Sequence, residues 1–191
     1  MNNPNPDGKG VSSVLATLDE ARGGLTVAAP KQIDQVTTEL FTSLFVLESE
    51  FRFKPVVGKT YYLYRQPERF WLGLTPSDML GEAVAGRFIG HCVLQTDMTW
   101  TLELAEAVAA DDEFMAWLAA KRAAFERRLG DAEKVDDILP VYESRLSFYR
   151  RASAFGVAHS LSRSMSASGI SGLSYDEARG LLTDASDRDD D

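Results

Sequence analysis

The sequence predicts an α+β domain in which a three- or four-stranded antiparallel meander is packed with long helices that come before and after it in the chain. Residues 55–102 contain short runs rich in β-branched and aromatic residues, which are typical of strands. Outside this stretch, apolar residues recur every three or four positions, as they do on one face of a helix. This pattern predicts three long helices, at about residues 31–51, 111–129 and 142–165.

Length and composition predict one globular domain. The chain has 191 residues, of which 45% are hydrophobic and 26% charged, as is usual for a soluble protein. Turn-forming residues at 1–10 predict a flexible segment, and five aspartates within residues 183–191 predict an acidic disordered tail there. The globular domain is therefore expected at 11–182. The net charge of −9 argues against binding to DNA through overall charge.

Three observations predict a cytoplasmic protein. No apolar segment typical of a signal peptide is visible near position 1. The longest apolar run, at about 44–47, is far shorter than the roughly 20 residues that a membrane span needs. The single cysteine, Cys92, excludes an intrachain disulfide and fits a reducing compartment.

The predicted sheet begins with a hairpin. Residues 59–65 and 69–75 form its two strands, and Pro67 lies in the turn between them. A third strand at 88–94 returns after an excursion at 76–86, and the segment 97–101 follows it. Both faces of these strands are apolar, which favours a sheet sandwiched between helices over a sheet with one face covered by a partner.

The helices have local start and stop signals. A short helix is expected at 12–22, before the long helix at 31–51. Acids such as Asp111 open the helix at 111–129, and Gly130 is expected to end it. Ser174 and Glu177 form a capping box for a final short helix that ends at about 182.

The last long helix has small residues at every fourth position. They are Ala152, Gly156, Ser160 and Ser164. Such a stripe permits close packing against another helix, either within the monomer or across a homodimer.

Motifs for known chemistry are sparse. Two histidines and one cysteine without paired spacing argue against a metal site, and no cofactor fingerprint is visible. His91 and Cys92 are adjacent in a strand, so they point to opposite faces and do not form a dyad. We interpret Cys92 as a small buried thiol.

The candidate site residues fall into three groups. The catalytic candidates are Asp97, Arg65 and His91. The aromatic residues form either a stacking platform or core, and they are Tyr62, Tyr64, Trp71 and Trp100. Arg150 and Arg151, with Arg145 and Arg163, either bind an acidic partner or form a solvated face.

Asp97 also has a structural interpretation. We expect its carboxylate to accept a hydrogen bond from the amide or the hydroxyl of Thr99, and we expect Trp100 to insert into the core.

Several segments resemble a bacterial family that has a small animal relative. They are PVVGKTYYLYR at 55–65, FWLGLTP at 70–76, FIG at 88–90, LQTDMTW at 94–100 and NPDGKG at 5–10. The chain resembles domain-of-unknown-function family 2452 over residues 5–182. It departs from that family after Pro76, where SDML at 77–80 replaces a Trp-containing segment. The resemblance implies one folding unit and no established activity.

Two classes of function remain open on the sequence. The first is a non-catalytic interaction or structural domain, which we prefer because no catalytic constellation is visible. Its partner would be another protein, or a second copy bound through the helix that bears Gly156. The alternative is an enzyme with a sparse carboxylate and arginine site at the end of the sheet.

Overall fold

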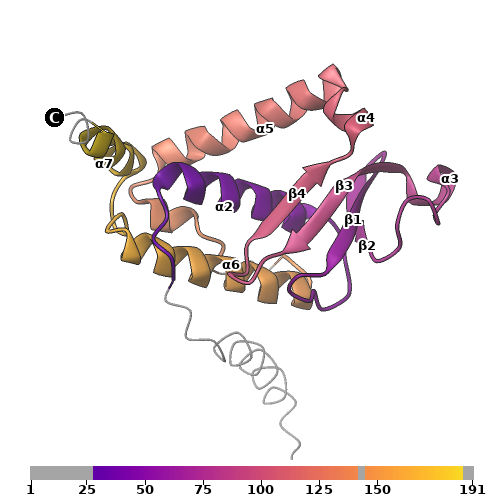
Figure 1. Cartoon of the computed structure of the whole chain (residues 1–191), viewed down its shortest axis with the longest axis horizontal. Helices are drawn as coiled ribbons and strands as arrows, with labels where there is room; N and C mark the ends of the chain where they lie inside the picture. Colours follow the sequence, from indigo (N-terminus) through magenta and orange to yellow (C-terminus); the bar gives the residue numbers. More distant parts are fainter. Residues whose placement is uncertain (1–27, 142–144, 187–191) are drawn as a thin grey trace, which may run out of the picture.

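The computed structural model describes residues 28–141 and 145–186, and these residues confirm the predicted α+β class. Figure 1 shows a helical layer with a sheet at one end. In chain order the elements are α2 (Ile33–Glu48), β1 (Thr60–Gln66), β2 (Arg69–Gly73), α3 (Glu82–Ala85), β3 (Arg87–Leu94), β4 (Trp100–Leu104), α4 (Glu106–Ala109), α5 (Asp112–Asp131), the 3-10 turn η1 (Val135–Ile138), α6 (Phe148–Ala167) and α7 (Tyr175–Ser186). The predicted flexible segment 1–10, the helix at 12–22 and the end of the acidic tail lie outside the described residues.

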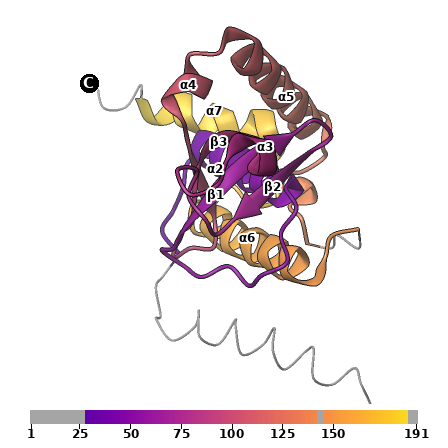
Figure 2. The ribbon, with the colours of Figure 1, turned by 90° about the vertical axis from the view of Figure 1, so that its right-hand side faces the viewer.

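Helix α2 lies in the middle of the helical layer, between α5 and α6 (Figures 1 and 2). The first residues of its apolar stripe, Ile33, Val36 and Leu40, are fully buried. At roughly 1.5–3 kcal/mol for each buried aliphatic side chain, α2 is a principal source of core stability before chain entropy is subtracted. Among the described helices none is long and apolar enough to cross a membrane.

The four antiparallel strands lie in the order β2-β1-β3-β4. The third strand pairs with β1 rather than with β2, so the order is not that of a sequential meander. A β-bulge interrupts this pairing, because Leu63 and Tyr64 face Gly90 and Phe88 and leave Ile89 as the extra residue. Gly90 is required there, since a Cβ at this position would lie 2.2 Å from the carbonyl oxygen of Glu103.

Trp100 joins the sheet to two helices. Its side chain is 1% exposed, which confirms that it inserts into the core. The indole Nε1 donates to Ser153 Oγ of α6 at 3.1 Å, and the backbone amide donates to Ser43 Oγ of α2 at 2.9 Å. The first residue of β4 is therefore held by both helices.

The described residues do not form the expected sandwich. Tyr61 and Leu63 of β1 point into the core, whereas the opposite face of the sheet leaves His91 and Glu103 exposed. Only a corner of that face is covered by α3, at the place where Trp71 Nε1 donates to the carbonyl of Ala85 at 2.8 Å. The sequence pattern predicted apolar residues on both faces but did not show which face the helices would cover.

The end of α2, the end of α5 and the start of α6 differ from the predicted bounds. Helix α2 ends at Glu48, earlier than predicted, because the next residues turn towards the sheet. There the amide of Glu50 donates to the carbonyl of Phe70 at 2.9 Å. Helix α5 continues past Gly130, and α6 begins at Phe148 with residues 142–144 outside the described part. The predicted capping box is confirmed, because the Ser174 amide donates to Glu177 Oε2 at 2.8 Å and Ser174 Oγ accepts from the Glu177 amide at 3.4 Å.

The small residues of α6 do not all face another helix. A Cβ on Gly156 would lie 2.8 Å from the terminal methyl of Met98, which belongs to the turn between β3 and β4. Gly156 is buried within the monomer by this turn. The close packing was predicted correctly at this position, but the partner is a turn.

Candidate functional site

The open face of the sheet carries a hollow of about 560 Å³. Antiparallel register aligns Tyr62 of β1 with His91 of β3, and His91 with Glu103 of β4, so that the three side chains share this face. The hollow is lined by Thr60, Tyr62, His91, Val93, Thr101, Leu102 and Glu103. It therefore extends across three strands, from β1 to the edge strand β4.

Three aromatic rings form one end of this surface. The rings of Tyr62 and His91 lie edge to face with centroids 5.4 Å apart, and those of Phe88 and His91 lie edge to face at 5.1 Å. The Tyr62 and Phe88 centroids are 6.3 Å apart. These separations lie within the favourable range for aromatic pairs, so the three rings hold one another in place while His91 remains exposed.

Among the described residues that line the hollow, Glu103 alone carries a carboxylate. Its side chain is exposed and has no ion-pair partner among the described residues. Thr101 supplies a hydroxyl beside it, which accepts from Gln95 Nε2 at 2.9 Å. The hollow thus combines aromatic faces with hydroxyl groups and one free negative charge.

The predicted aromatic platform divides between three environments. Tyr62 lies on the open face. Tyr64 and Trp71 stack at 4.7 Å at the corner covered by α3, where the Tyr64 hydroxyl donates to the carbonyl of Thr75 at 2.8 Å. Trp100 belongs to the core. Phe88 and Glu103 complete the open face although the sequence analysis did not single them out. The signal available for them was their place in the strands, where Phe88 pairs with Tyr64 of β1 and Glu103 pairs with His91 of β3.

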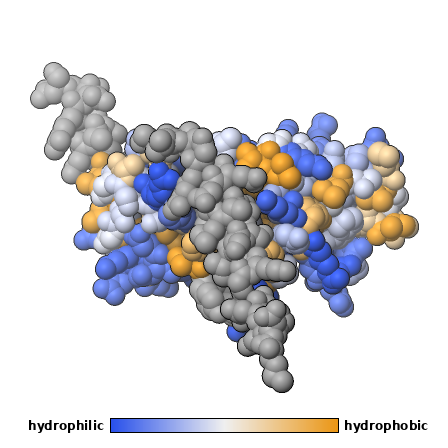
Figure 3. Space-filling model, turned by 90° about the horizontal axis from the view of Figure 1, so that it is seen from below, coloured by the Kyte–Doolittle hydropathy of each residue, from blue (hydrophilic) through white to orange (hydrophobic). Residues whose placement is uncertain are grey.

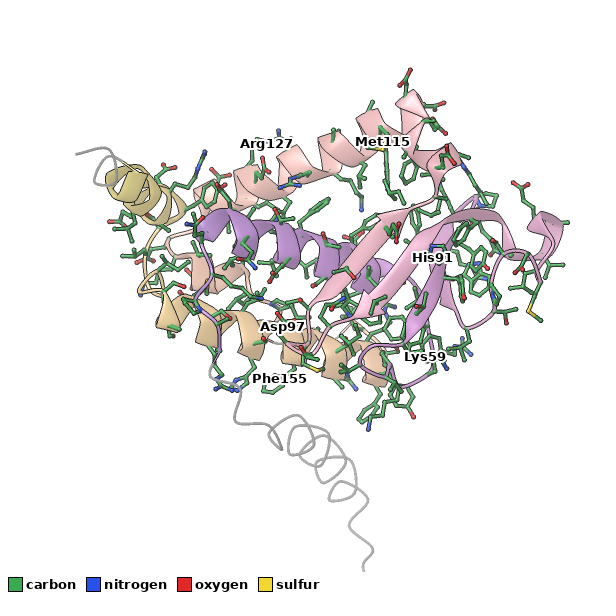
Figure 4. All side chains as sticks on the ribbon, viewed as in Figure 1. Lys59, His91, Asp97, Met115, Arg127 and Phe155 are labelled. Atoms are coloured by element: carbon green, nitrogen blue, oxygen red, sulfur yellow. The ribbon has the colours of Figure 1, made fainter. Side chains whose placement is uncertain are left out.

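The three catalytic candidates lie in different parts of the molecule. His91 lies in mid-sheet and Asp97 at the end of the β3–β4 hairpin beside α6 (Figure 4). Arg65 lies near the last residue of β1, and its guanidinium carbon is 5.5 Å from the centre of the Trp117 ring on α5. The structure does not bring the three side chains together.

Asp97 has both carboxylate oxygens engaged. Oδ1 accepts from the Thr99 amide at 3.1 Å and from its hydroxyl at 2.7 Å, as the sequence predicted. Oδ2 accepts from Lys31 Nζ at 2.5 Å, and the same ammonium donates to Glu39 at 2.5 Å. Lys31 could not be identified from the sequence, because its partner lies 66 positions away.

Opposing effects set the charge states of this pair. Burial acts to lower the pKa of Lys31, but the hydrogen bonds and charges of Asp97 and Glu39 outweigh it and leave that pKa raised. Burial acts to raise the pKa of Asp97, yet the bonds from Lys31 and Thr99 leave it lowered. Both groups are therefore held in their charged forms, as a structural ion pair requires.

The arginines of α6 have separate roles. The Arg150 guanidinium donates through Nε to the carbonyl of Leu47 at 2.9 Å and through Nη2 to that of Glu48 at 3.2 Å, and so caps the end of α2. Burial lowers the pKa of Arg150. Arg151 and Arg163 are exposed.

Cys92 is a buried free thiol on the inner face of the sheet. Burial raises its pKa to about 12. His91 lies on the opposite, exposed face, so the two residues form no dyad. Among the described residues no group of three or more His, Cys, Asp and Glu side chains is arranged to hold a metal ion.

Comparisons of the chain with protein-family models, curated proteins and solved structures find no match.

Proposed function

We propose that this protein is a non-catalytic interaction domain that binds a partner protein on the open face of its sheet. One observation carries this proposal: the exposed His91, with Tyr62 and Phe88, forms a pre-arranged aromatic surface that the described helices leave uncovered. Aromatic side chains on rigid strands offer a large contact area at little cost in conformational entropy. The proposal includes a cytoplasmic location and membership of family 2452.

The β2 edge of the sheet is occupied, which supports binding on the face rather than strand addition at that edge. At the β2 edge the amide of Leu72 donates to the carbonyl of Glu50 at 3.0 Å, and Glu50 N donates to Phe70 O at 2.9 Å. An added strand needs these backbone groups free. At the β4 edge the amide of Trp100, the first residue of the strand, is bonded to Ser43.

No observation favours the enzyme alternative at the end of the sheet. Both oxygens of Asp97 are held by Lys31 and Thr99, and Arg65 packs on aromatic rings elsewhere. A carboxylate that is held in an ion pair with a lowered pKa is a poor general base.

Site-specific photocrosslinking tests the proposal. A photoreactive phenylalanine analogue replaces His91 in the full chain, and in a control it replaces Met115, which is exposed on α5 (Figure 4). We expect the probe at position 91 to give a defined protein adduct in cells that express the protein, and the probe at 115 to give none. Excess unmodified protein should suppress the adduct, whereas an excess of the Tyr62→Ala/Phe88→Ala variant should not.

Two results would contradict the proposal. One is crosslinking of the same proteins from both positions, which would show non-specific capture. The other is suppression by the Tyr62→Ala/Phe88→Ala variant that equals suppression by the unmodified protein. Thermal melting of the variant establishes that it is folded, which is expected because both side chains are partly exposed.

A further inference from the structure

Helix α6 has a positively charged outer side in an acidic protein. Between Phe148 and Ala167 it contains three arginines and one histidine but no Asp or Glu, although the whole chain has a net charge of −9. Four of its exposed residues recur at every fourth position: Arg151, Phe155, His159 and Arg163. We call these four residues the outer stripe of α6. Figure 4 shows Phe155 pointing from the helix away from the sheet and from α2.

The two arginines of the outer stripe carry no carboxylate partner among the described residues, unlike the cations that form ion pairs within the chain. Arg69 pairs with Glu50, Arg87 with Asp111, Lys121 with Glu48 and Arg122 with Glu126. Within the described residues neither Arg151 nor Arg163 pairs with a carboxylate. Their guanidinium groups are thus open to carboxylates from outside the described part of the chain.

The middle of the outer stripe is aromatic. The rings of Phe155 and His159 are nearly parallel, at 7°, with centroids 6.3 Å apart, and Phe155 is 37% exposed. At the start of the same helix Phe148 and Tyr149 are 43% and 37% exposed. In the view from below, Figure 3 shows that hydrophobic and hydrophilic groups alternate over the part that the grey atoms leave visible.

We propose that the outer stripe of α6 docks a short acidic segment of another protein. A guanidinium binds a carboxylate through two parallel hydrogen bonds, so Arg151 and Arg163 would each take one acidic side chain. Their separation of twelve positions corresponds to about 18 Å along a helix axis. The segment would therefore carry acids about 18 Å apart, with an apolar side chain between them that packs on Phe155 and His159.

Charge favours a short peptide over a larger polyanion. A nucleic acid or an anionic membrane would extend beyond the outer stripe and meet the field of a chain whose net charge is −9. A second copy bound symmetrically would place like charges of two outer stripes against each other. A segment of a few turns gains the attraction of the two arginines without these costs. This surface lies on α6 rather than on the open face of the sheet, so the inference stands independently of the proposed function.

Fluorescence anisotropy with the full chain tests the inference. The probe is a fluorescein-labelled, mainly alanine helical peptide with a glutamate pair at each end, about 18 Å apart, and a central leucine. The matched probe has glutamine at the same positions. We expect the glutamate peptide to bind at least tenfold more tightly than the glutamine peptide, and added salt to weaken it.

The variant Arg151→Glu/Arg163→Glu should weaken binding of the glutamate peptide at least tenfold. The control Arg127→Glu/Arg128→Glu makes the same change of charge at two exposed arginines of α5 and should change binding by less than threefold. If the charge reversal on α6 prevents folding, Arg151→Gln/Arg163→Gln replaces it and should also weaken binding. Equal binding of the two peptides, or an equal loss in the α5 control, would overturn the inference.

Two further experiments test whether a different molecule occupies the outer stripe. Tighter binding of a labelled single-stranded oligonucleotide than of the glutamate peptide would overturn the inference in favour of a nucleic acid. Peptide binding that occurs only after Asp187, Asp189, Asp190 and Asp191 are changed to asparagine would identify the chain's own tail as the occupant, and would overturn the inference of a separate partner.

Discussion

The ammonium of Lys31 lies 2.5 Å from a carboxylate oxygen of Asp97, although the two residues are 66 positions apart. Lys31 is 7% exposed, and its backbone amide and carbonyl both bond to Ser168 Oγ just after α6. This residue therefore joins the start of α2 to the β3–β4 turn and to the end of α6. Because the ion pair is partly buried, removing one partner leaves charges that water only partly solvates.

The change Lys31→Met should destabilise the protein by about 2 kcal/mol, the usual worth of hydrogen bonds to charged groups. For a chain of this size that corresponds to a fall in melting temperature of about 4–8 °C. The control is Lys121→Met, which removes the exposed pair with Glu48 and should cost less than about 1 kcal/mol. Thermal melting of both variants checks this, and equal losses would contradict a special role for Lys31.

The contribution of the Lys31–Asp97 ion pair to the free energy of unfolding should depend on pH in both the acidic and the basic range. The folded-state pKa of Asp97 lies below its ordinary value of 3.8, so its stabilisation is complete above that value and is lost as pH falls through the folded-state pKa. The pKa of Lys31 is raised above 10.5, so its stabilisation is present below 10.5 and is lost as pH rises through the higher value.

The stability difference between wild type and Asp97→Asn should accordingly be largest near neutral pH and shrink below about pH 4. Urea unfolding at pH 7, 5, 4 and 3 measures this difference. A difference that stays constant across the series would show that the Asp97 charge adds nothing to stability.

Gly156→Leu should destabilise the protein by about 1–3 kcal/mol, because its side chain would occupy the space of Met98. Ala167→Leu on the exposed side of the same helix is the control and should be close to neutral. The double variant Gly156→Leu/Met98→Ala should recover part of the loss, since it removes the side chain that clashes. Urea unfolding measures these three variants and Met98→Ala, and strict additivity in the double variant would show that the contact does not set the cost.

Cys92 should resist alkylation in the folded protein. With a pKa of about 12 in place of its ordinary 9.0, the fraction of thiolate at pH 8 falls about a thousandfold. Burial adds the requirement that the sheet open before the reagent can enter. Iodoacetamide labelling followed by mass spectrometry should show slow modification in buffer and rapid modification in urea, whereas equal rates would contradict burial of the thiol.

The sequence by itself determined the features that depend on neighbours along the chain. The three-and-four spacing of Ile33, Val36 and Leu40 predicted the buried face of α2, because that spacing repeats once per helical turn. The bond from Thr99 to Asp97 was also predictable, since the side chain of an aspartate reaches the amide two residues on in any such turn.

Only the tertiary structure decided which elements became neighbours. Periodicity showed that both faces of the strands were apolar, but not that His91 and Glu103 would lie together on an open face. It placed Gly156 in a small-residue stripe, but not against Met98. The ion pair of Lys31 and Asp97 could not be predicted for the same reason. A sequence pattern records which side of an element an apolar residue occupies, whereas long-range charge pairs and open surfaces depend on how the elements pack.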